Sequence, residues 1–134
     1  MAGDFLEAHQ WLVLDERPGF LRIRAHVPEQ VKNTRGQLFG GFTPTYVDLV
    51  ALFTVRAGED LQVGLCNWLA TSSMRLDYFE PILGPEFVIE SQLVKRHGRT
   101  NFVETRFYAP KNTLAVFAVT TIRELKFDPS LGDG

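Results

Sequence analysis

The segment from Phe42 to Val55 constrains the fold of this chain most. It reads Phe-Thr-Pro-Thr-Tyr-Val-Asp-Leu-Val-Ala-Leu-Phe-Thr-Val. Its length favours a helix over a strand, and Pro44 suits the first turn of that helix. Apolar residues occur nearly all round the helix, and Asp48 is its only acid. We therefore expect a buried helix that ends near Gly58.

Residues beyond this helix alternate in a way that predicts strands. The even-numbered residues from Ala70 to Tyr78 should face one side of a strand, and the odd-numbered residues from Thr71 to Asp77 the other. On this pattern Thr71 and Met74 point in opposite directions.

Further strands are predicted on both sides of the helix. Before it, residues 20–27 alternate between apolar and polar types. After it, strands are expected near 86–96 and 101–109, which flank a hairpin at 97–100, and over 114–125. One buried helix followed by an antiparallel meander predicts an α+β fold whose sheet is wrapped on the helix.

A chain of 134 residues is long enough for one domain, which we place over residues 1–134. Residues 1–19 are expected to be an N-terminal extension. Within it, Asp4 and Glu7 have the spacing of a helix capping box, so residues 5–10 should form a short helix. Residues 127–134 are expected to be a flexible polar tail.

Composition excludes several classes of function. The net charge is −2 and no block of Lys and Arg occurs, which argues against a nucleic-acid partner. No apolar run approaches the roughly 18–20 residues that cross a bilayer, and the first residues do not resemble a signal peptide. The three His are scattered and Cys66 stands alone, so no metal site is expected. We expect a cytoplasmic protein without a membrane partner.

Asp48 is the candidate catalytic residue that the residues themselves suggest. A carboxylate in apolar surroundings is costly unless it is paired or protonated. Gly40 and Gly41 come shortly before it, and glycines at a helix start let unpaired amides approach a developing negative charge. A tight turn into the helix explains the glycines equally well. If both features serve chemistry, they are expected to converge on one carbonyl carbon.

These residues resemble the signature of hotdog-fold acyl-CoA thioesterases. Asn33-Thr-Arg-Gly-Gln-Leu-Phe-Gly-Gly41, followed by Asp48 seven residues later, is similar to the PaaI-like and 4-hydroxybenzoyl-CoA thioesterase families. Thr71 followed by Tyr78 resembles the family's strand at the subunit interface. The resemblance covers roughly residues 20–125 and implies a hotdog fold, in which an antiparallel sheet wraps a long central helix.

The resemblance also implies roles for single residues. Asp48 would be the general base or nucleophile, and the Gly40 amide would polarise the thioester carbonyl. Asn33 would orient the reacting groups, although a turn-forming role explains it as well. Thr71 of a neighbouring subunit would hold water or the carboxylate, although it is also an ordinary strand residue.

Substrate-binding residues are expected at Phe39, Gly41, Tyr46, Ser72, His97, Gly98 and Arg99. The hairpin of His97, Gly98 and Arg99 falls where the family has a Gly-Arg/Lys hairpin near the CoA moiety, although a solvated turn explains Arg99 as well. Phe39 and Tyr46 suggest an apolar acyl pocket, although aromatic residues there could equally be core.

Phe39 departs from the family pattern, which has His at this position. A phenyl ring makes none of the hydrogen bonds of an imidazole. Either the ring takes over packing at the helix entrance, or a hydrogen bond that the reaction needs is lost.

Three functions are compatible with these residues. The first is hydrolysis of an acyl-CoA thioester to free acid and CoA, with CoA as part of the substrate and no cofactor. The second is non-catalytic binding of acyl-CoA. The third is hydration or dehydration of an acyl thioester, against which Phe39 counts. The resemblance implies a homodimer or homotetramer with sites between subunits.

Overall fold

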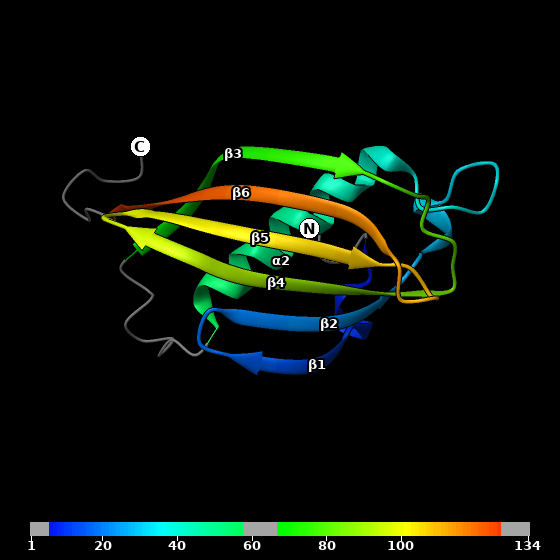
Figure 1. Ribbon diagram of the computed structural model, residues 1–134, viewed down its shortest axis with the longest axis horizontal. Coiled ribbons are helices and arrows are strands. Elements are labelled where there is room, and N and C mark those ends of the chain that lie inside the picture. The colour runs from blue at the N-terminus through cyan, green and yellow to red at the C-terminus, as the bar shows by residue number, and fades with distance from the viewer. Residues whose placement is uncertain (1–5, 58–66, 127–134) are drawn as a thin grey trace.

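The computed structural model describes residues 6–57 and 67–126 of the chain. A single antiparallel sheet has the strand order β1-β2-β4-β5-β6-β3 and curves around the helix α2, which crosses behind it (Figure 1). The strands are β1 (Leu12–Arg17), β2 (Phe20–His26), β3 (Asn67–Tyr78), β4 (Glu86–His97), β5 (Thr100–Tyr108) and β6 (Leu114–Lys126). The helices are η1 (Ala8–Gln10), η2 (Glu29–Val31), η3 (Gly40–Phe42) and α2 (Thr43–Arg56). This is the predicted α+β architecture.

Helix α2 buries one face against the sheet. Tyr46, Val47, Val50, Ala51 and Val55 are buried, as the period of an α-helix requires for residues on one side. The opposite face is not covered within one chain, because Phe53 is 47% exposed and Asp48 is half-buried. The prediction of all-round burial is therefore wrong for the single chain. The predicted helix end, Gly58, lies outside the described residues, and Ala57 follows the last helical residue.

The N-terminal segment differs from its prediction in two ways. Instead of a helix over 5–10, a single 3-10 turn spans Ala8–Gln10, because Glu7 adopts a left-handed conformation with φ 55°. Asp4 lies outside the described residues, as do Cys66 and the tail at 127–134. Residues 12–17 of the expected extension form β1, which pairs with β2.

The strands after the helix follow the predicted order. Strands β4 and β5 meet at the expected hairpin, where Gly98 has φ +60°, a conformation that residues with a side chain rarely adopt. Strand β3 contains a bulge between Thr71 and Ser73, so that Thr71 pairs with Ile122 while Ser73 pairs with Thr121. Ser72 is the extra residue.

Candidate active site

Asp48 and Thr71 meet between α2 and β3. Asp48 lies in the second turn of α2 on the face that the sheet does not cover. The Thr71 hydroxyl donates a hydrogen bond to one carboxylate oxygen of Asp48. The contact lies within one chain, whereas the resemblance implied that Thr71 comes from a neighbouring subunit. A single chain thus holds its acid in place through one carboxylate oxygen.

The bulge at Ser72 makes this contact possible. In a regular strand Thr71 and Met74 would point to opposite faces. One extra residue reverses the alternation, so Thr71 faces the helix together with Met74, which packs on the core. Ser72 itself is exposed, and its hydroxyl donates to the Thr121 carbonyl at 3.1 Å. In this structure the side chain of Ser72, a candidate binding residue, therefore joins β3 to the neighbouring strand β6.

Gly40 and Gly41 form the turn that leads into α2. Thr43 donates its amide to the Gly40 carbonyl, and the Tyr78 hydroxyl donates to the same oxygen at 2.8 Å. The first amides of a helix have no acceptor inside that helix. The resemblance placed Tyr78 on the interface strand, but nothing in the sequence indicated its contact with the Gly40 turn.

Helix geometry separates the Gly40 amide from Asp48. Eight residues at 1.5 Å of rise each place them about 12 Å apart along the axis. Such a distance exceeds the reach of one carbonyl group. Within one chain the Gly40 amide and the Asp48 carboxylate therefore do not reach the same carbonyl carbon.

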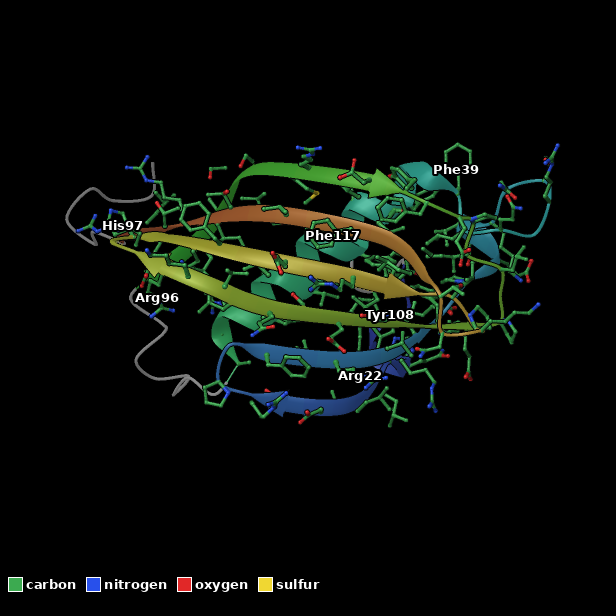
Figure 2. The ribbon with its side chains drawn as sticks, viewed as in Figure 1. Arg22, Phe39, Arg96, His97, Tyr108 and Phe117 are labelled. Atoms are coloured by element: carbon green, nitrogen blue, oxygen red, sulfur yellow. The ribbon has the colours of Figure 1, made fainter. Side chains whose placement is uncertain are left out.

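Phe39 lies directly over Gly41. A side-chain carbon added at Gly41 would stand 3.0 Å from a ring carbon of Phe39, closer than van der Waals contact allows. The Phe39 ring meets Phe42 edge-to-face, with ring centres 5.9 Å apart, and is 51% exposed. Figure 2 shows the ring pointing outward at the helix entrance. Gly41 is thus the residue that makes room for this ring.

Asn33 uses its side chain to hold its own loop. Its side-chain oxygen accepts the amides of Arg35 and Gln37 at 2.9 and 3.0 Å, and its side-chain nitrogen donates to the Gln37 side chain at 3.1 Å. These bonds correspond to the turn-forming interpretation.

Tyr46 belongs to the core and not to a substrate pocket. It is fully buried, stacks on Trp11 with ring centres 5.7 Å apart, and donates to the His26 carbonyl at 3.3 Å. Burial, together with the negative charge of Glu7, raises the pKa of the Tyr46 hydroxyl well above its ordinary value. Two residues of helix rotate Tyr46 by about 200° from Asp48, and in this structure its side chain packs in the core.

The hairpin of His97, Gly98 and Arg99 lies where β4 and β5 meet, at one end of the sheet. Strand β4 has 12 residues, which extend for about 40 Å. His97 and Phe39 accordingly stand at opposite ends of the molecule (Figure 2). Within one chain the hairpin does not join the glycine turn.

Within residues 6–57 and 67–126 there is no cluster of three or more His, Cys, Asp or Glu that could hold a metal ion. None of the helices described is long and apolar enough to cross a membrane.

Solved structures share this architecture. A hypothetical thioesterase of Streptococcus pneumoniae, solved with coenzyme A, matches with a TM-score of 0.74 and 16% identity over 88% of each chain. Thioesterase HI1161 of Haemophilus influenzae matches with a TM-score of 0.78 and 9% identity over 93% of this chain and 82% of its own. A phenylacetic acid degradation-related protein of Ralstonia eutropha matches with a TM-score of 0.75 and 17% identity, over 90% and 87%.

Comparisons by sequence give no further relatives. No family model matches the chain, and no curated protein matches it. The structural likeness shows that the chain has the hotdog fold, with one long helix against a six-stranded antiparallel sheet.

Proposed function

We propose that this protein is an acyl-CoA thioesterase whose site is shared between two copies of the chain. One copy supplies Asp48 held by Thr71, and the other supplies the Gly40 amide. The Thr71–Asp48 hydrogen bond is the observation that carries the proposal, because it orients a half-buried carboxylate on an uncovered helix face. Solved structures of this fold that are named thioesterases, one of them with coenzyme A, support the substrate class.

The ends of β3 explain how two copies would complete the site. Strand β3 is the last strand of the sheet, so its outer edge has no strand partner among residues 6–57 and 67–126. If two β3 strands pair antiparallel about a two-fold axis, the Tyr78 end of one lies beside the beginning of the other. Tyr78 holds the Gly40 turn. The Gly40 turn of one copy thereby approaches Thr71 and Asp48 of the other.

The chemistry follows from these groups. The free oxygen of Asp48 takes a proton from water as the water oxygen attacks the thioester carbonyl carbon. The negative charge that forms on the carbonyl oxygen is stabilised by the Gly40 amide. When the carbon–sulfur bond breaks, the CoA sulfur leaves and receives the proton from Asp48. The products are a carboxylic acid and CoA, and the reaction consumes only water, so no cofactor is proposed.

Hydrolysis itself is tested with a panel of acyl-CoAs and detection of the free thiol. We expect turnover that is lost in Asp48→Asn. Retained acyl-CoA binding without hydrolysis in the wild-type protein would instead make it a binding protein. A single turnover in ¹⁸O-water tests for a nucleophile, because label in the Asp48 carboxylate can arise only from a mixed anhydride that water opens at the Asp48 carbon.

Mixing two inactive variants tests the shared site. Gly40→Pro removes the amide hydrogen, and the Phe39 ψ of 126° suits a residue before proline. Gly40→Ala is the matched control, because it keeps the amide and its side-chain carbon would lie 3.8 Å from Tyr78.

Random mixing of Gly40→Pro with Asp48→Asn should restore about one quarter of the wild-type sites, since half of the dimers then carry one intact site. Light scattering should show at least a dimer. A mixture that remains as inactive as its components, while the wild-type protein is active, would refute the shared site.

A further inference from the structure

A row of buried hydroxyl groups crosses the sheet beneath α2. Ser91 on β4, Thr105 on β5 and Thr120 on β6 are fully buried, and they occupy three neighbouring strands. Thr71 continues the row on β3, where it is exposed at the edge of the sheet. The row therefore begins in the interior and ends at the Asp48 carboxylate.

This row separates the apolar core into two clusters. On one side of it lie Ile89, Phe107 and Ala118, which belong to the larger cluster. On the other side, Val103 and Ile122 belong to the smaller one. A polar layer through a core costs free energy unless its hydroxyls are hydrogen-bonded.

The hydroxyl groups of the row differ in whether they have a hydrogen-bond partner. The Ser91 and Thr105 hydroxyls share a hydrogen bond of 3.1 Å, and Thr71 donates to Asp48. Between these two pairs, the Thr120 hydroxyl is buried and has no hydrogen-bond partner in the part of the chain that the structure describes. Buried hydroxyls in folded proteins are nearly always paired with protein or with ordered water.

Strand register places Thr120 diagonally from both of its neighbours in the row. Thr120 pairs with Val103, two residues from Thr105, and with Met74, the next helix-facing residue after Thr71. Diagonal neighbours stand about 7–8 Å apart between Cα atoms. Their hydroxyls are then too distant for a direct bond of about 2.8 Å, but one bridging water spans the gap. The bulge at Ser72 interrupts the regular ladder between β3 and β6 beside this position.

We propose that Thr120 holds an internal water that donates a hydrogen bond to the Thr71 hydroxyl. Thr71 has a single proton and accepts through its oxygen. A donor at that oxygen directs the Thr71 proton toward Asp48. Thr120 is thus a positioning residue, two hydrogen bonds away from the carboxylate. The effect on turnover rests on the proposed function, whereas the water itself does not.

The test uses variants that keep the shape of the side chain. Thr120→Val removes the hydroxyl, Thr120→Ser keeps it, and Thr54→Val is the matched control. Thr54 is equally buried, but its hydroxyl donates to the Val50 carbonyl within α2 at 2.8 Å and lies outside the row. We expect Thr120→Val to lower kcat about three- to tenfold, the effect of one neutral hydrogen bond, without a matching change in KM. Thr120→Ser and Thr54→Val should retain kcat.

A crystal structure supplies a readout besides activity. In the wild-type protein, ordered water should lie within hydrogen-bond distance of the Thr120 and Thr71 hydroxyl oxygens, and it should be missing in Thr120→Val. No water at Thr120, or a Thr120→Val protein with a higher melting temperature and unchanged kcat, would overturn the proposal. If the wild-type protein hydrolyses no thioester, the proposed function fails while the crystallographic test still decides on the water.

Discussion

Thr71 and Asp48 are 23 residues apart in the sequence and share a hydrogen bond within one chain. The bond joins an edge strand to the uncovered face of the central helix, so the acid is oriented before any partner arrives. Preorganisation of this kind favours catalysis, because no reorganisation is needed when charge develops.

Asp48→Asn should lower kcat by about 100-fold or more, the scale expected for a lost general base. The free energy of unfolding should change little, because the amide is nearly isosteric and the Thr71 hydroxyl can donate to its oxygen. Steady-state kinetics on the best acyl-CoA and a urea titration check both parts. Turnover within a few-fold of the wild-type value would remove Asp48 from the mechanism.

Tyr78→Phe should lower kcat/KM about three- to tenfold, because the Gly40 carbonyl loses the 2.8 Å bond that fixes its turn. The control is Tyr108→Phe (Figure 2). It removes a hydroxyl at the end of β5, two strands away from β3 in the sheet. Equal kinetics for the two variants would show that Tyr78 does not position the turn.

Tyr46 should make the folded state sensitive to alkali. Burial raises the pKa of its hydroxyl, so above about pH 10 the unfolded chain ionises this group while the folded chain keeps it protonated. The folded state then binds one proton more than the unfolded state, so the free energy of unfolding falls as pH rises. Tyr46→Phe should flatten the dependence of unfolding free energy on pH between about 10 and 11.5. If the unfolding free energies of the wild-type protein and of Tyr46→Phe fell in parallel over this pH range, Tyr46 would not be the group responsible.

Periodicity was enough to predict the helix and most strands, because each buries one regular face. Periodicity could not predict which residues of β3 face the helix. Ser72 and Ser73 are both small and polar, so nothing in the alternation from Ala70 to Tyr78 marks the residue at which the faces exchange. The alternation alone therefore predicts that Thr71 and Met74 face opposite sides of the strand.

The position of a residue relative to the candidate site is hard to predict from the sequence for a different reason. Tyr46 was grouped with Asp48 by proximity in sequence, although helical rotation puts the two on opposite faces. The resemblance places the hairpin at His97 near the CoA moiety, and the 12 residues of β4 put His97 at the opposite end of the molecule from Phe39 (Figure 2). Nearness along the chain and nearness in space differ most in long regular elements such as these.

Phe39→His should leave kcat/KM unchanged or lower it. The ring lies over Gly41 and meets Phe42 edge-to-face, so it holds the turn from which the Gly40 amide projects. An imidazole keeps the ring shape but reduces this apolar contact. Phe39→Leu, which retains apolar bulk without a ring, is the control for packing alone. If an imidazole hydrogen bond were what the reaction lacks, Phe39→His would instead raise kcat/KM about tenfold, equivalent to about 1.4 kcal/mol of transition-state stabilisation. Kinetics of both variants on the best acyl-CoA decide between packing and lost chemistry, and a tenfold rise confined to Phe39→His would refute the packing role.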